Sequence, residues 1–317
     1  MSNHNKPQVF ATSTAQHLLD AICRQLDVTP GKYSLSHRGG EIQINLEGSV
    51  AGNHVFVIGS TQPPYENTLE LAMLVDAAKR SSAREITVIA TYLSYTQAVL
   101  RKEDKREPIG LPLALAPLKE AGPNRLILLD VSHREAFAFS GFNPTHIYGS
   151  LFALPALKAH HEKQPFVVAP LHGGGVERAR RIAELIGTDY VPETRYLDSE
   201  AVMFVDAVLA DPQDLIECAQ EAKFKGVKKV SAYFSHTTLS DVFEAERLQS
   251  SAAIDEIFIT DTVARSCNLL MMRNKFTILK SLPLLVEVVR RVNNGESLSR
   301  DVLKRALEAQ YTLRAVA

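Results

Sequence analysis

Two segments in the second half of the sequence carry residue types that could bind an anionic ligand. The first is Leu171-His172-Gly173-Gly174-Gly175, a glycine turn after an apolar run. Such a turn at the start of a helix can present backbone N–H groups to an anion. It also resembles the oxyanion loop of some α/β-hydrolases, but the GxSxG elbow that those enzymes need is absent. We therefore interpret it as a turn that opens the following helix.

The second segment is the run 205–215, VDAVLADPQDL, which ends in several acidic residues. Asp206, Asp211 and Asp214 could together suit a cation or a polyol. Asp211-Pro212 is also a common way to begin a helix, with aspartate as the N-cap and proline in the first turn. The helix start is the simpler interpretation.

Other chemical motifs are missing from the sequence. It contains no GxxxxGK[ST] loop, no GxGxxG after a strand, and no HExxH, HxH or CxxC spacing. P-loop kinases, dinucleotide-binding enzymes and zinc proteases are therefore not indicated. The ten histidines are scattered, and the three cysteines lie far apart. This pattern predicts neither a dedicated metal site nor a disulfide framework, and it favours a reducing compartment.

The overall composition is that of an ordinary globular protein. The 317 residues carry 35 basic and 36 acidic side chains, a formal charge of −1. A near-neutral chain lacks the basic stripe typical of nucleic-acid binders. We find no apolar run of the ~18–20 residues needed to span a membrane, and no secretory signal at the start. We expect a cytoplasmic protein without nucleic-acid or membrane partners.

Strand-like apolar runs alternate with helical patterns along the chain, which predicts an α/β fold with mostly parallel sheets flanked by helices. The expected strands are 54–60, 85–92, 125–131, 165–171, 201–209, 229–235 and 256–262, and the clearest helices are 68–82, 175–187 and 214–226. We interpret 43–56 as an antiparallel hairpin and 142–165 as a hinge without strand pattern. The hinge divides the chain into domains 1–149 and 150–317, and the last helix can pack back on the first domain.

In order along the chain, several segments are similar to phosphoribosyl pyrophosphate synthetases (ribose-phosphate pyrophosphokinases). These are 55–95, 106–110, 121–131, 167–180, 230–240, 256–263 and 288–299. The resemblance covers nearly the whole chain. It implies two phosphoribosyltransferase-like domains, an oligomer (a dimer or a hexamer) and a role in nucleotide biosynthesis. The implied reaction moves the β,γ-diphosphate of ATP to ribose 5-phosphate with magnesium.

The segment that binds ribose 5-phosphate in this family departs from the family pattern. The family has two acids and an Asp-Thr-Gly-Gly-Thr type turn, and here only the first acid, Asp206, remains. A phosphate cradle needs glycines so that successive N–H groups can approach the oxygens. Pro212 lacks an N–H, Gln213 fills space, and Asp211 and Asp214 add charges that each repel a phosphate by about 1 kcal/mol even in water. The sequence therefore predicts a degenerate sugar-phosphate site.

The segments that bind ATP in the family also differ. Glu41 is retained beside the first hairpin, but His37 replaces the family's aromatic residue. Where the family has a basic run after the position of Tyr95, this chain has TQAVLR at 96–101. Where the family has an acid after the position of Pro170, this chain has Leu171. The family's magnesium-binding histidine corresponds to Ser132.

His133 stands one place after that position. On an extended segment this shift points the side chain the opposite way, so His133 could bind the metal only if the chain turns locally. In the family's mobile catalytic loop, Arg195 matches the arginine but the lysine is missing. That lysine would stabilise the charge of the transferred group.

These observations leave three functional hypotheses. The first is a catalytically impaired family member that acts as a regulatory or scaffolding subunit, alone or with an active paralogue. The second is an active diphosphokinase that uses His133, Arg195, Asp206 and Glu41 with magnesium and ATP. The third is a protein repurposed to bind a less anionic small ligand. Apart from magnesium in the second hypothesis, no cofactor is predicted.

Overall fold

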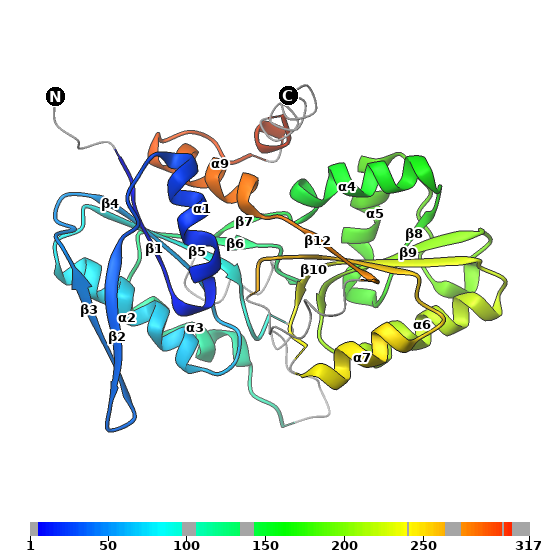
Figure 1. The fold of residues 1–317 in the computed structure, drawn as a ribbon, viewed down its shortest axis with the longest axis horizontal. Coiled ribbons are helices and arrows are strands. Elements are labelled where there is room, and N and C mark those ends of the chain that lie inside the picture. The colour runs from blue at the N-terminus through cyan, green and yellow to red at the C-terminus, as the bar shows by residue number, and fades with distance from the viewer. Residues whose placement is uncertain are drawn as a thin grey trace. The chain divides into compact units, whose positions relative to one another are not determined.

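The computed structural model describes residues 6–96, 106–133, 143–239, 241–263, 274–299 and 301–305. The chain divides into two compact units, one made of Met1–Tyr148 and Leu282–Ala306, the other of Gly149–Ser281 and Leu307–Ala317 (Figure 1). Each unit has its own parallel sheet and its own core. Within the described ranges, no helix is long and apolar enough to cross a membrane.

The first unit is built on a five-stranded parallel sheet with strand order β1-β4-β5-β6-β7. Its strands are β1 (Gln8–Ala11), β4 (His54–Ser60), β5 (Glu85–Tyr92), β6 (Arg125–Leu129) and β7 (Thr145–Ile147). Its helices are η1 (Ser13–Ala15), α1 (Gln16–Leu26), α2 (Glu66–Arg80), α3 (Gly110–Ala121) and α9 (Leu282–Asn293).

Helices cover this sheet because its strands are apolar on both faces. Alternate residues of one strand point to opposite faces. Val55 and Val57 of β4 belong to a core with Leu71 and Leu74 of α2. Phe56 points the other way and is also fully buried. α1 packs against β1 and α9, so the helix 282–293 joins the first unit although it follows the second in sequence.

The hairpin of the first unit differs from the one expected at 43–56. Strand β3 (Glu41–Glu47) pairs antiparallel with β2 (Lys32–Arg38), whereas 54–56 lies in β4 of the parallel sheet. The turn is Gly39-Gly40, with φ of 61° and 86°. Two successive positive φ angles suit a two-residue hairpin turn, and glycine adopts them without steric cost. The prediction was wrong because the alternation at 43–47 was joined to the following strand instead of the preceding one.

The second unit has a five-stranded parallel sheet with strand order β12-β11-β10-β9-β8. Its strands are β8 (Val167–Pro170), β9 (Ala201–Leu209), β10 (Lys229–Thr237), β11 (Glu256–Thr260) and β12 (Phe276–Leu279). Its helices are α4 (Ser150–Lys163), η3 (Gly173–Gly175), α5 (Val176–Ile186), η4 (Thr194–Tyr196), α6 (Pro212–Phe224) and α7 (Val242–Ser250).

Helices cover both faces of the second sheet. On one face, Phe204 of β9 and Phe234 of β10 share a core with Leu215 of α6 and Leu248 of α7. On the other face, Met203 and Val205 of β9 pack with residues of α4 and α5. The predicted α/β class with parallel sheets flanked by helices is confirmed.

The segment expected to be a hinge without strand pattern, 142–165, contains a strand and a helix. It contains the short strand β7 and the 14-residue helix α4, and Pro155 lies inside that helix. The prediction missed both elements because β7 has only 3 residues and because an internal proline argues against a helix.

Candidate functional site

The candidate site lies at the carboxyl edge of the second sheet, where ligands bind in open α/β folds. Two connections form most of it. The turn Leu171–Gly175 joins β8 to α5, and residues 210–211 join β9 to α6. The Leu171 backbone N–H donates to the Val205 carbonyl at 3.2 Å. A Cβ on Gly175 would lie 2.9 Å from the same carbonyl oxygen, so only glycine allows this close approach.

The connection between β9 and α6 is short, and a backbone N–H at the start of α6 is already hydrogen-bonded within the chain. β9 runs without interruption to Leu209, and that residue still pairs with Thr237 of β10. Asp211 is the N-cap of α6, and its Oδ1 accepts the Gln213 N–H at 2.8 Å. Pro212 has no N–H to offer. One backbone donor at the start of α6, the Gln213 N–H, is therefore bound by a carboxylate of the same chain, as expected from the interpretation of Asp211-Pro212 as a helix start.

Asp206 forms an ion pair with Arg178, a residue that no sequence motif indicated. Its Oδ1 lies 3.6 Å from Nη1 of Arg178, and the two side chains are only 11% and 9% exposed. The same oxygen accepts the Ala207 N–H at 2.6 Å. Arg178 lies four residues before Ile182, on the face of α5 that packs on the sheet. A cation on an apolar helix face is the signal that could have indicated a buried acidic partner.

Asp214 and Gln213 bind neighbouring residues in the same unit. Nε2 of His172 lies 3.1 Å from Oδ2 of Asp214, and both side chains are about half exposed. Nε2 of Gln213 donates to Glu217 at 2.6 Å, and its Oε1 accepts from Arg247. The structure thus brings Asp214 to the glycine turn, but as the partner of a histidine of the same chain.

Cys218 of α6 packs behind this region. Its Sγ lies 3.9 Å from the Leu171 carbonyl oxygen. Burial, followed by the nearby charges of Glu221, Asp214 and Glu217, raises the pKa of the Cys218 thiol to about 11. The thiol is therefore protonated at neutral pH and is not an activated nucleophile.

Arg195, the predicted catalytic cation, lies on η4. Its Nε is 2.7 Å from the Glu193 carboxylate, both side chains are more than half exposed, and its guanidinium lies 4.8 Å from the centre of the Tyr196 ring. Arg195 therefore neutralises an acid of its own loop.

The predicted nucleotide-binding residues His37 and Glu41 lie at the end of the β2–β3 hairpin. His37 pairs with Ile42 and Glu41 pairs with Arg38, and both predicted residues are exposed. Their role in binding a nucleotide stays a prediction. Most of the run 96–101 lies outside the described residues.

His133 follows β6 in the first unit and is partly buried. The chain bends at Ser132, and Asp130 has a φ of 44°, so this segment is not extended. The role of His133 as a metal ligand stays a prediction. Oγ of Ser132 is buried and has no hydrogen-bond partner within the described part of the chain.

A magnesium ion in this chain would need ligands beyond a cluster of the described side chains. Among them, no group of three or more histidine, cysteine, aspartate or glutamate side chains lies close enough together to hold a metal. Magnesium in nucleotide enzymes is usually held by one or two carboxylates together with substrate phosphates. A metal here would depend mainly on the phosphates of a ligand.

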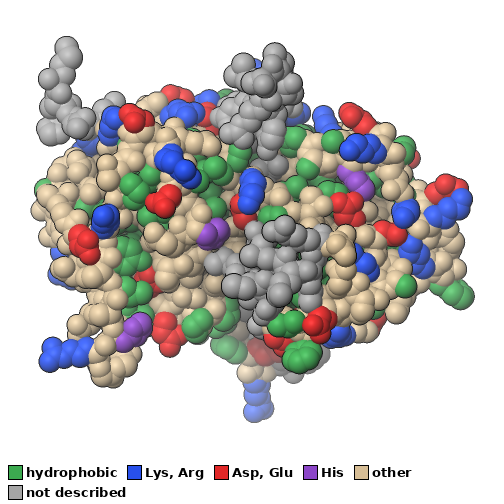
Figure 2. All heavy atoms as spheres, in the orientation of Figure 1, with side chains coloured by type: hydrophobic (Ala, Val, Ile, Leu, Met, Phe, Trp, Pro, Cys, Tyr) green, Lys and Arg blue, Asp and Glu red, His purple; other side chains and the backbone are tan. Residues whose placement is uncertain are grey.

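The surface in view in Figure 2 shows basic and acidic side chains interspersed over both units. On that face, neither sign gathers into a continuous patch. This distribution agrees with the formal charge of −1.

Comparison with known proteins agrees with this architecture. Residues 7–122 match the N-terminal domain of ribose phosphate pyrophosphokinase, and residues 179–303 match the phosphoribosyl synthetase-associated domain. The ribose-phosphate pyrophosphokinase of Pasteurella multocida is 31% identical over 92% of this chain and 98% of its own length. That of Campylobacter jejuni is 32% identical over 82% of this chain and 87% of its own length.

The fold has a similar solved structure. The crystal structure of phosphoribosylpyrophosphate synthetase from Mycobacterium smegmatis has a TM-score of 0.83 at 24% identity, over 92% of this chain and 99% of that one. This similarity agrees in fold with the sequence matches, which span both units and establish that the chain belongs to the ribose-phosphate pyrophosphokinase family.

Proposed function

We propose that this chain is a ribose-phosphate pyrophosphokinase-family protein that does not make phosphoribosyl pyrophosphate. It acts instead as a regulatory or scaffolding subunit, either in a homo-oligomer or with an active paralogue. The observation that carries the proposal is the β9–α6 connection, where a carboxylate of the chain itself caps the helix that would receive the sugar phosphate.

Space and donors both support this proposal. In a phosphate cradle, successive backbone N–H groups point at one anion. Here β9 remains paired with β10 through Leu209, and only Ala210 and Asp211 separate it from α6. Asp211 takes the Gln213 N–H, and Pro212 supplies none. A bound phosphate would have to displace the cap without gaining a glycine loop in its place.

Electrostatics points the same way. The carboxylates of Asp211 and Asp214 stand at the start of α6, and each would repel a nearby phosphate charge by about 1 kcal/mol even at the dielectric of water. The helix dipole offsets about 0.3–1 kcal/mol. Asp206, the one acid retained from the family pattern, is engaged with Arg178. Repulsion therefore exceeds attraction for a doubly charged sugar ester.

Two measurements on the purified full-length protein test the proposal. Isothermal titration with ribose 5-phosphate should give no heat of binding, and a coupled assay with ATP and magnesium should give no phosphoribosyl pyrophosphate above a blank. Turnover at a rate typical of enzymes would overturn the proposal and favour the active diphosphokinase, with His133 and Arg195 as the first residues to replace.

A variant with the family turn provides the matched control. It replaces residues 210–214 by A210D, D211T, P212G, Q213G and D214T, which restores the glycines and hydroxyl donors. We expect this variant to bind ribose 5-phosphate measurably, whereas D211A alone should not. If the restored turn binds no better than the natural one, the capped helix is not the cause of the loss.

The regulatory part of the proposal has its own test. The protein is mixed with an active bacterial ribose-phosphate pyrophosphokinase, and the mixture is followed by size-exclusion chromatography and by activity. Co-elution with a change in the partner's activity supports a regulatory subunit. Separate elution of this chain as an oligomer of its own favours a homo-oligomeric scaffold, and separate elution as a monomer contradicts both arrangements.

A further inference from the structure

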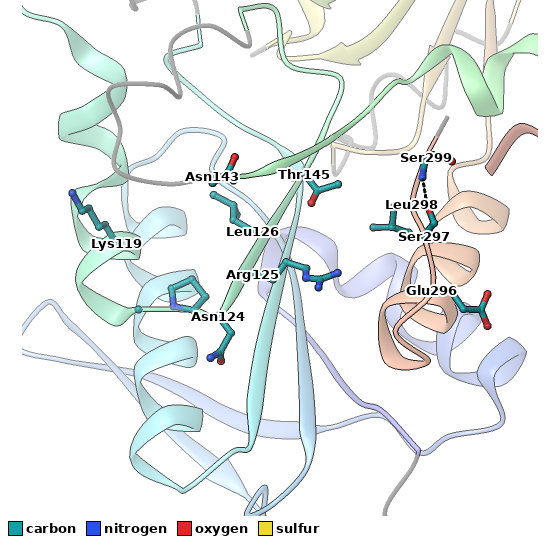
Figure 3. A pocket seen from close by; sticks show the side chains of 12 residues that line it. Lys119, Asn124, Arg125, Leu126, Asn143, Thr145, Glu296, Ser297, Leu298 and Ser299 are labelled. Carbon is teal, nitrogen blue, oxygen red and sulfur yellow. Dashed lines mark hydrogen bonds between the residues drawn. The ribbon is translucent and has the colours of Figure 1, made fainter. Parts of the chain in front are cut away.

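A cavity of about 980 Å³ lies in the first unit, at the end of the sheet where β6 begins. The C-terminal end of α3, the start of β6, residues beside β7 and the segment after α9 surround it. Its lining residues are mostly polar, and Figure 3 shows Arg125 extending from β6 toward the side formed by Glu296–Ser299.

The charge of this cavity is positive. Lys119 and Arg125 line it, and in Figure 3 their side chains extend away from each other, that of Arg125 toward Glu296–Ser299. In the described part of the chain, Arg125 forms no ion pair or hydrogen bond through its side chain. Glu296 also lines the cavity, but its carboxylate lies 3.2 Å from Arg291 and accepts from Asn294 at 3.1 Å. The acid is thus neutralised from within its own segment, while Arg125 remains available to a ligand.

The polar walls are held in place before any ligand arrives. On one side, Oδ1 of Asn124 accepts the Ile86 N–H at 2.7 Å, which fixes the amide group. On the other side, Oγ of Ser297 accepts the Ser299 N–H at 3.1 Å, the interaction drawn in Figure 3. The Ser297 hydroxyl proton is then free to be donated outward.

The segment that carries Ser297 is fixed from behind. Nη1 of Arg291 contacts the Ser297 carbonyl at 3.4 Å, and its Nε donates to Glu287 at 2.6 Å. The Glu287 side chain is only 6% exposed. A wall anchored on a buried ion pair loses little conformational entropy when a ligand binds.

We propose that this cavity binds a small, multiply charged oxyanion without an aromatic ring, such as a phosphorylated sugar or a polycarboxylate. Arginine, lysine, amide and hydroxyl groups are the donors that such anions use. No aromatic side chain is among the lining residues, so a nucleobase would find no ring to stack on. The proposal concerns the first unit and does not depend on the proposed function.

Isothermal titration of the full-length protein with inorganic diphosphate, citrate and ADP tests this site. We expect diphosphate or citrate to bind more tightly than ADP, with a dissociation constant that rises with salt concentration. Arg125→Ala should weaken binding at least tenfold, because it removes charge-assisted hydrogen bonds. Arg125→Lys keeps the charge but loses the planar fork, and should bind with intermediate affinity.

Lys32→Ala is the matched control, because it removes an exposed cation from β2, away from the cavity lining. It should leave the affinity unchanged. The proposal is overturned if neither diphosphate nor citrate binds, if ADP binds more tightly than both, or if the Arg125→Ala and Lys32→Ala variants bind alike. Far-UV circular dichroism shows whether the Arg125 variants keep the fold, and this is expected because Arg125 is exposed.

Discussion

Removal of Arg178 is the sharpest test of how the candidate site is organised. Arg178→Met keeps most of the side-chain volume but leaves Asp206 without this cation. At 3.6 Å, the attraction of the pair is about 5 kcal/mol with an effective dielectric constant of about 20. Because both side chains are nearly buried, we expect a loss of about 3–5 kcal/mol in the free energy of unfolding.

The measurement is urea unfolding followed by far-UV circular dichroism, since the chain has no tryptophan for fluorescence. Asp206→Asn is combined with Arg178→Met in a double-mutant cycle. The double variant should be less destabilised than the sum of the two single variants, because it no longer buries a carboxylate whose cation has been removed.

Arg195→Met is the matched control, since it makes the same substitution in an exposed ion pair. Arg195→Met should lower the free energy of unfolding by no more than about 1 kcal/mol. The reasoning is refuted if Arg178→Met costs as little as Arg195→Met, or if the effects of Arg178→Met and Asp206→Asn simply add.

Three further predictions concern the second unit. Asp211→Ala and Asp241→Ala each remove the N-cap of a helix, α6 and α7, and each should lower the free energy of unfolding by about 1 kcal/mol in urea titrations; no change would mean that the caps are not used in solution. Burial raises the pKa of Asp255, but hydrogen bonds from a backbone amide and two lysines outweigh it and hold that pKa below its usual value. Asp255 therefore stabilises the fold above the unfolded pKa of about 3.9, and this contribution is lost as the pH falls through the folded pKa. The free energy of unfolding of the Asp255→Asn variant should fall less steeply with decreasing pH than that of the natural protein. Equal slopes for the two proteins would contradict the lowered pKa of Asp255. Because the pKa of Cys218 is about 11, roughly one thiol in a thousand is ionised at pH 8. Iodoacetamide should therefore alkylate Cys218 far more slowly than it alkylates the thiol of free glutathione, which mass spectrometry of the Cys218 peptide can measure. Equal rates of alkylation would show that the Cys218 thiol is not buried.

The hairpin illustrates where sequence patterns reach their limit. The alternation at 43–47 correctly indicates a strand with one face partly buried, since Ile44 and Leu46 pack against the core of the first unit. The pattern does not say which neighbour that strand pairs with. Pairing is decided by the turn at Gly39-Gly40 and by the burial of 54–60, which has apolar contacts on both faces and so belongs inside the parallel sheet.

The sequence by itself determined the elements whose signal is local. Strands 54–60, 85–92 and 201–209 have the bounds expected from continuous apolar runs, because a strand buried on both faces needs apolar side chains at every position. Asp211-Pro212 starts α6 for an equally local reason, since the cap bonds an amide two residues away.

Only the tertiary structure decided which distant groups meet. Arg178 reaches Asp206 because α5 packs across β9, and Arg125 lies in the same cavity as Ser297 because α9 returns to the first unit. Contacts of this kind depend on how helices lie on a sheet, a property that no short stretch of residues encodes. The family's retained acid could therefore be recognised from the sequence, and Arg178 on an apolar helix face could indicate a buried acidic partner, but the sequence could not show that this partner is Asp206.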